Sequence, residues 1–315
     1  MDRRRAPCLL HGERSHATLC SRPVRASAPH RSAPLVFALA LGLVACEDAD
    51  RDTIDESADA GGDGPQVFGD GPCEFPLGVT EHDIEAGGES RRYLLWYGEE
   101  VDPEVPPAVI FAWHGFGGGP HDAAAMIEVE ARWRDAIVVA PQGLDRTLPG
   151  FPDAQPGFQT QRGEQDDRDI ALFDAIESEL AALGCLDEAR EYSTGFSNGG
   201  FMTNVIACHR GDRLAAAAPG GAGGPFDADC REPVPMFIFH GRRDSTVPYD
   251  FGLESRDIWL ATNGCDSSAA PDDGCAAAPG CPDEAPVEFC SYDLDHEPLP
   301  DDAARIEEFF RTHVR

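Results

Sequence analysis

The sequence predicts an α/β protein with a mostly parallel sheet and helices on both of its faces. Two runs, PAVIFAWHG and PMFIFHG, are continuously apolar, as in strands that are buried on both faces. Segments with apolar residues at helical spacing separate these and other strand-like runs. Strands that alternate with helices indicate βαβ units, whose neighbouring strands are parallel.

The elements follow in order from about residue 73. The expected strands are RRYLLWYG, PAVIFAWHG, AIVVAPQG, REYSTGFS, LAAAAPGG, PMFIFHG and VEFCSYDL. The expected helices cover residues 121–135, 166–184, 198–209, 250–263 and 301–312, the first as one continuous helix. Residues 148–163 are rich in Pro and Gly and are expected to form an irregular loop. The sequence has no internal repeat and no sign of a second domain.

The N-terminal segment predicts export. The apolar run from Ala33 to Ala45 follows Arg25 and Arg31, is too short to span a bilayer and suits the core of a signal peptide. It ends in LVAC, which resembles the bacterial lipobox, in which the cysteine, here Cys46, is acylated. We therefore expect residues 1–45 to be a lipoprotein signal peptide, with an ordinary secretory signal as the alternative.

Charge and composition divide the rest of the chain. Residues 46–72 are acidic and poor in apolar residues, so we expect a disordered tether there, followed by one folded domain over residues 73–315. The formal net charge of −32 excludes nucleic acid as a partner, because phosphate binding needs a basic surface. So acidic a body would contact an anionic membrane only through a lipid anchor. The expected location is a bacterial membrane, facing the periplasm or the exterior, or otherwise outside the cell.

Cysteine usage agrees with export. Eight cysteines follow Cys46, and an even number in an exported chain indicates disulfides. Zinc is the rival interpretation, but the sequence contains no C-x-x-C pair, so we expect no metal. These cysteines are Cys73, Cys185, Cys208, Cys230, Cys265, Cys275, Cys281 and Cys290.

The stretch GFSNGG contains the candidate nucleophile, Ser197. This serine lies at the junction of an expected strand and an expected helix, which is the setting of a nucleophile elbow. Gly195 and Gly199 suit such a turn because the strand and helix backbones pass so close that a Cβ would clash. The turn lifts the hydroxyl above the C-terminal edge of the sheet, where α/β proteins bind their ligands.

A serine hydroxyl is a weak nucleophile that needs a base, and on an elbow fold the order is serine, acid, histidine. His296 lies between the last expected strand and the last expected helix and is the candidate base. His209 and His313 lie in expected helices, and His240 ends a buried strand before any suitable acid.

The candidate acid is Asp244, in the loop that follows PMFIFHG. A carboxylate at this edge of the sheet can accept a hydrogen bond from the imidazole Nδ1–H and stabilise the imidazolium. Its rivals are Asp250, Asp293 and Asp295.

The stretch HGFGGG, residues 114–119, follows an early buried strand and is the candidate oxyanion loop. Backbone N–H groups must point at the oxygen on which charge develops. Asn198, directly after the serine, supplies one; Phe116 is the expected second donor and Gly117 the alternative. The loop lacks the Lys-Ser/Thr sequel of a phosphate-binding loop, and we expect His114 to brace it.

Together these stretches resemble the secreted α/β-hydrolases of the polyhydroxybutyrate depolymerase and feruloyl esterase type, carbohydrate esterase family 1. The resemblance rests on HGFGGG, YSTGFSNGGFMTNVIAC, HGRRDSTVPY, TNGC and VEFCSYDLDHEPLP, and it runs from about Arg91 to the C-terminus. It implies an α/β-hydrolase catalytic domain over residues 73–315, with Ser197 as nucleophile, Asp244 as acid and His296 as base. The family commonly has Gly-His-x-Trp-Pro where this chain has DHEPLP, a departure that leaves the triad intact and bears on the substrate class.

The resemblance also includes Cys265, in TNGC, and a strand that ends near Cys290. We expect Cys265 and Cys290 to pair, or one of them to pair with Cys275 or Cys281, which would hold the loop of the candidate base.

The predicted function is hydrolysis of carboxylic esters through an acyl-enzyme, without a cofactor. Feruloyl or acetyl esters on polysaccharides and polyhydroxyalkanoates are the substrates considered, and Phe116 and Phe196 beside the site suit an apolar or aromatic acyl chain. A peptidase of the same fold is one alternative, although no peptide-end binding feature is visible. The other is a non-catalytic, polysaccharide-binding surface lipoprotein, against which the complete triad argues.

Overall fold

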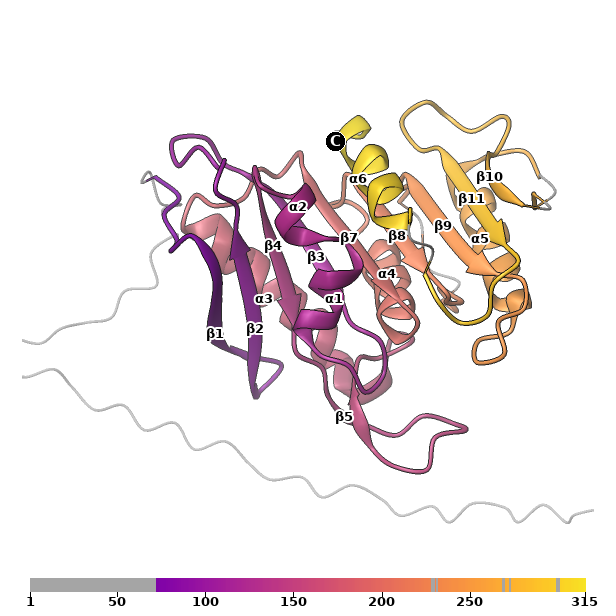
Figure 1. Ribbon diagram of the computed structural model, residues 1–315, viewed down its shortest axis with the longest axis horizontal. Coiled ribbons are helices and arrows are strands. Elements are labelled where there is room, and N and C mark those ends of the chain that lie inside the picture. Colours follow the sequence, from indigo (N-terminus) through magenta and orange to yellow (C-terminus); the bar gives the residue numbers. More distant parts are fainter. Residues whose placement is uncertain (1–71, 228–229, 231, 268–269, 272, 299–300) are drawn as a thin grey trace, which may run out of the picture. The chain divides into compact units, whose positions relative to one another are not determined.

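One nine-stranded sheet organises the described part of the chain (Figure 1). The computed structural model describes residues 72–315 except 228–229, 231, 268–269, 272 and 299–300. The expected signal peptide, Cys46 and nearly all of the expected tether lie outside these residues. Among the described residues, no helix is long and apolar enough to cross a bilayer.

The sheet has the order β1-β2-β4-β3-β7-β8-β9-β11-β10. Neighbours from β4 to β11 are parallel, whereas β1, β2 and β10 add antiparallel pairs toward the two edges. The strands are β1 (Gly78–Ala86), β2 (Glu89–Tyr97), β3 (Ala108–Trp113), β4 (Ala136–Pro141), β7 (Glu191–Phe196), β8 (Ala216–Gly220), β9 (Met236–Gly241), β10 (Gly274–Ala277) and β11 (Val287–Tyr292). The mostly parallel sheet predicted from the continuous apolar runs is confirmed, and every residue of β3, β4, β8 and β9 is buried.

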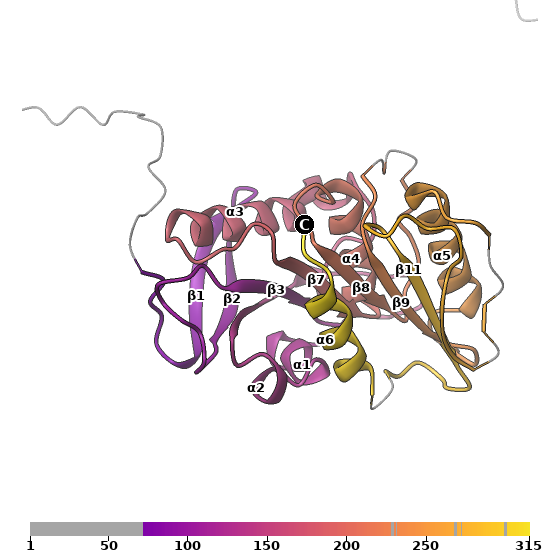
Figure 2. The same ribbon diagram turned by 90° about the horizontal axis from the view of Figure 1, so that it is seen from above.

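Helices cover both faces of this sheet (Figure 2). On one face lie α3 (Arg168–Ala182), α4 (Asn198–His209) and α5 (Tyr249–Asn263); on the other lie α1 (Pro120–Met126), α2 (Val129–Arg132) and α6 (Asp302–Thr312). Each face has its own hydrophobic core, one containing Phe173 and Trp259 and the other Trp133 and Phe310. A short 3-10 helix, η1 (Glu164–Asp167), precedes α3.

Two local predictions were wrong, and two edge strands were not predicted. The expected helix over 121–135 is broken at Glu128, whose φ of 49° separates α1 from α2. The loop over 148–163 contains β6 (Gln155–Gly157), which forms a hairpin with β5 (Leu144–Arg146). The edge strands β1 and β10 were not predicted: β1 alternates exposed and partly buried residues, and β10 has only four residues, Gly-Cys-Ala-Ala, without the β-branched or aromatic residues typical of strands.

All eight cysteines after Cys46 form disulfides: Cys73–Cys185, Cys208–Cys230, Cys265–Cys281 and Cys275–Cys290. The direct pairing of Cys265 with Cys290 is therefore wrong. The alternative, that one of them pairs with Cys275 or Cys281, holds for both, since Cys265 is bonded to Cys281 and Cys290 to Cys275. The reason is register: Cys275 lies opposite Cys290 in the antiparallel β10–β11 pair. Such bridges are typical of oxidising compartments outside the cytosol.

Candidate active site

Ser197 occupies a strained turn between β7 and α4, as the motif predicts. Its φ of 57° and ψ of −124° are unusual for a residue with a side chain. Its N–H donates to Gly220 O, with an N···O distance of 2.9 Å. A Cβ at Gly199 would lie 1.9 Å from Trp113 O, and one at Gly195 would lie 2.5 Å from the Gly199 carbonyl carbon. Close backbone packing therefore requires both glycines, and it presents the serine hydroxyl at the end of the central strand.

The three residues predicted from chain order meet above that turn. His296 Nε2 lies 2.8 Å from Ser197 Oγ, and His296 Nδ1 lies 2.6 Å from Asp244 Oδ2. The Asp244 carboxylate is fully buried, whereas the His296 side chain is 17% exposed. Because a carboxylate only accepts, Nδ1 carries the hydrogen and leaves the Nε2 lone pair facing the serine hydroxyl.

Backbone donors fix the Asp244 carboxylate. Its Oδ1 accepts from Thr246 N at 2.9 Å and Val247 N at 2.7 Å, so Oδ2 is turned toward the imidazole of His296. His240 Nε2 approaches the same Oδ2 at 3.4 Å but donates to Val247 O at 2.9 Å. Burial lowers the pKa of His240 and so disfavours a second positive charge beside Asp244.

The rivals of Asp244 lie elsewhere. Asp293 pairs with Arg243 at 2.8 Å on the exposed surface, and Asp250 lies in the first turn of α5. Asp295 has another position: its Oδ1 accepts from Ser245 N, Ser245 Oγ and His296 N, at 2.8, 2.9 and 2.9 Å. These hydrogen bonds lower the pKa of Asp295, and they join the loop of the acid to the loop of the histidine. The sequence does not reveal this bridge, which depends on two loops fifty residues apart.

The HGFGGG loop lies beside Ser197 and is held by defined contacts. Gly143 N donates to His114 Nε2 at 2.9 Å, so the other ring nitrogen carries the hydrogen and donates to Gly115 O at 2.7 Å. His114 therefore braces the loop, and burial lowers its pKa. Gly117 N already donates to Pro156 O at 2.8 Å, whereas Phe116 N has no partner among the described residues. Of the two expected second donors, only Phe116 therefore has a backbone N–H without an acceptor among the described residues.

Asn198 contributes at both its backbone and its side chain. As the first residue of α4, it has an N–H without an intrahelical acceptor, at the positive end of the helix dipole. Its side chain pairs with the backbone of Phe158: Oδ1 accepts from the N–H at 2.7 Å and Nδ2 donates to the carbonyl at 2.9 Å. The residue after the serine thus also anchors the chain that follows β6.

A pocket of about 260 Å³ opens at Ser197, and we call it the Ser197 pocket. Its lining is predominantly aromatic and aliphatic: Phe116, Leu148, Pro149, Phe151, Thr160, Ser197, Asn198, Phe201, Phe226, Thr246, Val247, Pro248 and Phe251. The predicted neighbour Phe116 belongs to this lining and packs on Phe151, with ring centroids 4.8 Å apart. Phe196 does not line it; its ring packs against His296 at 4.9 Å.

One group of side chains could bring three ligand atoms together around a metal ion. Among the described residues, only Cys275, Glu288 and Cys290 bring ligand atoms close enough to hold an ion, and both cysteines are bound in one disulfide. Their sulfurs are therefore not thiolates.

Comparison with known proteins identifies the family. The chain is 30% identical to a probable feruloyl esterase C of Aspergillus terreus over 226 residues, which is 67% of this chain and 77% of that protein. Feruloyl esterase C of Emericella nidulans is also 30% identical, with the same coverage. The chain belongs to the feruloyl esterase family. It is a carboxylic ester hydrolase, although no general family model matches the sequence.

A solved structure shows the same architecture. An acetyl xylan esterase from Aspergillus awamori superposes with a TM-score of 0.53 at 16% identity, over 74% of this chain and 99% of that one. Together with the largely parallel sheet and its two helical layers, this likeness gives the α/β-hydrolase fold. The resemblance stated from the sequence motifs is thereby confirmed.

Within this family member, the sequence did not reveal most of the pocket. Phe151, Phe201, Phe226 and Phe251 come from four separate segments, and only folding brings them to Ser197. The sequence did contain a signal that Phe201 shares a face of α4 with Asn204 and Cys208. These residues are three, four and seven positions apart, and residues at such spacings lie on one face of a helix.

Proposed function

We propose that the protein hydrolyses carboxylic esters with Ser197 as nucleophile, His296 as general base and Asp244 as the acid that orients it. The observation that carries this proposal is the continuous hydrogen-bonded chain from Ser197 Oγ through the imidazole to the buried carboxylate, with contacts of 2.8 and 2.6 Å. A serine becomes reactive when a neighbouring base takes its proton as it attacks.

In the first half of the reaction, Ser197 Oγ attacks the acyl carbon while His296 Nε2 accepts the hydroxyl proton. The imidazolium that forms is stabilised by Asp244, whose other oxygen is held by two backbone amides. Negative charge on the former carbonyl oxygen is met by the amides of Asn198 and Phe116. His296 then gives its proton to the leaving alcohol, and the acyl group stays on Ser197.

In the second half, water takes the place of the alcohol. His296 removes a proton from water as the water oxygen attacks the acyl carbon. The tetrahedral intermediate then collapses as the bond to Ser197 Oγ breaks and His296 returns the proton to Oγ, which releases the acid and restores the Ser197 hydroxyl. The protein groups complete this cycle without a cofactor.

We further propose an aromatic acyl group, attached to a polysaccharide, as the substrate. The relatives are named feruloyl esterases, and a flat aromatic acyl chain suits a pocket lined by two groups of phenylalanines, Phe116 with Phe151 and Phe201 with Phe226 and Phe251. Acetyl and hydroxyalkanoate esters fill less of this surface and are expected to bind less tightly.

The test is a panel of three esters, methyl ferulate, p-nitrophenyl acetate and a hydroxybutyrate oligomer, with the wild type and Ser197→Ala. We expect the highest kcat/KM for methyl ferulate and a loss of roughly 10⁴-fold or more on every active ester in the variant. Activity retained by Ser197→Ala contradicts the mechanism. A preference for the hydroxybutyrate oligomer contradicts the acyl assignment and leaves the mechanism intact.

Export and a lipid on Cys46 complete the proposal. The four disulfides support an oxidising destination, and the lipobox-like LVAC supports the anchor. Expression of the full chain in a bacterium fed labelled palmitate should label the wild type and not Cys46→Ala. Equal labelling of both, or of neither, contradicts the anchor.

A further inference from the structure

One wall of the Ser197 pocket consists of three phenylalanines from separate segments. Phe201 lies in α4, Phe251 lies in α5, and Phe226 lies in the connection between β8 and β9. The ring centroids are 6.1 Å apart for Phe201 and Phe226, 6.1 Å for Phe226 and Phe251, and 6.5 Å for Phe201 and Phe251. Phe226 is 42% exposed, so the other residues of the pocket cover it only in part.

Phe226 differs from the other two rings in its support. The connection that carries it runs over residues 221–235, and no helix or strand is formed by its described residues. A connection of this length has many accessible conformations unless contacts restrict it. The position of the Phe226 ring therefore depends on the contacts on either side of it in the chain.

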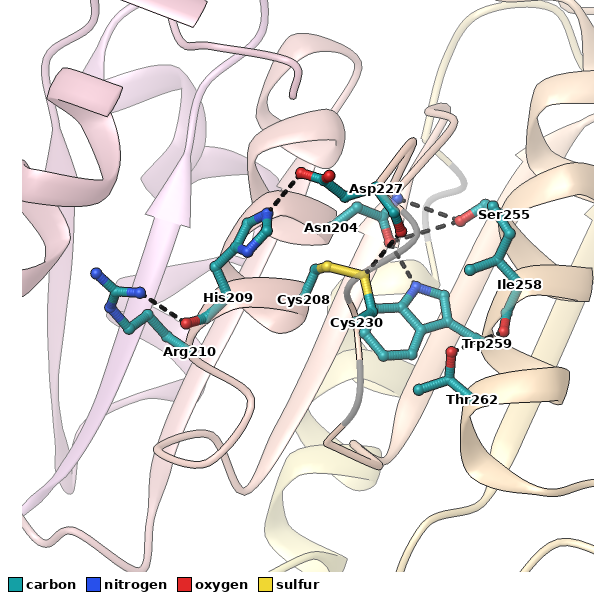
Figure 3. The surroundings of a disulfide bond; sticks show 10 residues. All are labelled: Asn204, Cys208, His209, Arg210, Asp227, Cys230, Ser255, Ile258, Trp259 and Thr262. Carbon is teal, nitrogen blue, oxygen red and sulfur yellow. Dashed lines mark hydrogen bonds and ion pairs between the residues drawn. A yellow bond between two sulfur atoms is a disulfide. The ribbon is translucent and has the colours of Figure 1, made fainter. Parts of the chain in front are cut away.

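The first contact precedes Phe226. Asn204, on α4, donates from Nδ2 to Gly223 O at 3.0 Å. Its Oδ1 accepts from Trp259 Nε1 at 2.8 Å, as Figure 3 shows. The Asn204 side chain is thereby fixed between α5 and the connection. A Cβ at Gly223 would lie 2.6 Å from the Phe251 ring, so the backbone here packs directly on the aromatic wall.

Two further contacts follow Phe226, and both start from the last turn of α4. Cys208 is bonded to Cys230, and His209 Nε2 lies 3.0 Å from Asp227 Oδ2, as Figure 3 shows. The histidine side chain is 8% exposed. Contacts on both sides therefore restrict Phe226. The hydrogen bond to Gly223 lies three residues before it, and the His209–Asp227 pair and the disulfide at Cys230 lie one and four residues after it. The helix that begins at the candidate nucleophile provides every one of these contacts.

We propose that the Cys208–Cys230 disulfide and the His209–Asp227 pair position Phe226 as a specificity-determining wall of the Ser197 pocket. This inference rests on the proposed function and assigns the selectivity of that site for bulky over small acyl groups. Neither the disulfide nor the pair touches the reacting atoms. Their effect is confined to the pocket surface, so they alter discrimination between acyl groups and leave the chemical step on a small acyl group unchanged.

The test compares p-nitrophenyl ferulate with p-nitrophenyl acetate, which share one leaving group, using the oxidised full chain. The measured quantity is the ratio of the two kcat/KM values. Phe226→Ala should lower this ratio about tenfold, and Cys208→Ala/Cys230→Ala should lower it about three- to tenfold through KM for the ferulate. Asp227→Ala keeps every disulfide and should lower it about two- to threefold, so it carries the test if the cysteine variant does not fold.

The matched control is Cys265→Ala/Cys281→Ala. The two disulfides span similar separations, 22 and 16 residues, so their loss relaxes the unfolded chain to a similar extent. Neither cysteine of the control lines the Ser197 pocket. The ratio of the two kcat/KM values should therefore stay within about twofold of the wild-type ratio in this variant. An effect that acts through Phe226 also predicts that adding Phe226→Ala to the Cys208/Cys230 variant gives the ratio of Phe226→Ala alone.

An unchanged ratio in the Cys208/Cys230 and Asp227 variants overturns the inference, and so does a combined variant in which the separate effects multiply. A fall that is equal for both disulfide variants also contradicts it, because a general loss of stability would then account for the change. A wild-type chain that turns over neither ester refutes the proposed function, and this inference with it. A wild type that is active on both esters keeps the two questions separate.

Discussion

Glu191 is buried at the start of the strand that leads to Ser197, and it makes the stability of the fold depend on pH. It is 1% exposed, and its Oε1 has no hydrogen-bond partner among the described residues. Burial, followed by the nearby Glu177 carboxylate, raises the pKa of Glu191 from 4.5 to about 8, against the smaller opposing effect of Arg213. The folded state therefore holds a proton that the unfolded chain releases near pH 4.5.

The sign and the size follow from this difference. A raised folded-state pKa contributes stability that is complete below about pH 4.5 and is lost as the pH rises through about 8. At about 1.4 kcal/mol for each pH unit, the full change is roughly 5 kcal/mol, of which about 4 kcal/mol falls between pH 5 and pH 9. Glu191→Gln keeps the shape and has no charge at any of these pH values. Its unfolding free energy relative to wild type should rise by about 4 kcal/mol from pH 5 to pH 9.

Urea unfolding, followed by circular dichroism at several pH values, measures this difference. The other titrating groups are shared by both proteins and cancel in the comparison. Glu104→Gln, at the exposed surface, is the control, and its relative stability should change by less than about 0.5 kcal/mol over the same range. The reasoning is refuted if the difference in the free energy of unfolding between Glu191→Gln and wild type stays constant across pH 5–9. That result would mean that the buried carboxyl does not retain its proton.

Three other perturbations have defined outcomes. Asp295→Ala removes the bridge between the acid and histidine loops, so kcat on p-nitrophenyl acetate should fall about 10- to 100-fold with KM nearly constant; unchanged kcat would contradict this. Gly199→Ala places a Cβ 1.9 Å from Trp113 O, so we expect no soluble folded protein on gel filtration, and a well-folded variant would disprove the close packing. Cys73→Ala/Cys185→Ala removes a disulfide whose cysteines are 112 residues apart, and it should lower the free energy of unfolding in urea by about 5 kcal/mol. Loss of the Cys208–Cys230 disulfide, with a separation of 22 residues, should lower it by about 3 kcal/mol. A larger loss for the Cys208–Cys230 disulfide would contradict the chain-entropy estimate.

The sequence predicts the central elements well because local chemistry decides them. β3 and β9 are buried on both faces, so their apolar runs are unmistakable. The elbow is equally local: Ser197 needs a glycine on each side because Trp113 and the strand backbone lie against the turn. The placement of Asp244 and His296 at the same sheet edge follows from the order of parallel strands, since both lie in loops after neighbouring strands β9 and β11.

Long-range register decides what the sequence leaves open. The Cys275–Cys290 bridge depends on a short edge strand, β10, whose four residues include none of the β-branched or aromatic residues typical of strands. Asp295 has the composition of any surface acid, and only the approach of the Ser245 loop makes it a bridge. Phe226 lies in a connection without a periodic pattern, so its place in the pocket wall depends on disulfide and side-chain contacts.

The most direct measurement of the central claim is the reaction of the full chain with a fluorophosphonate, followed by peptide mass spectrometry. Such reagents react with a serine whose proton is taken by a neighbouring base. The account predicts one label per chain, on the peptide that contains Ser197, and little or no label when His296 is replaced by alanine. Label on another residue, or equal label on Ser197 without His296, would contradict a serine activated by this histidine.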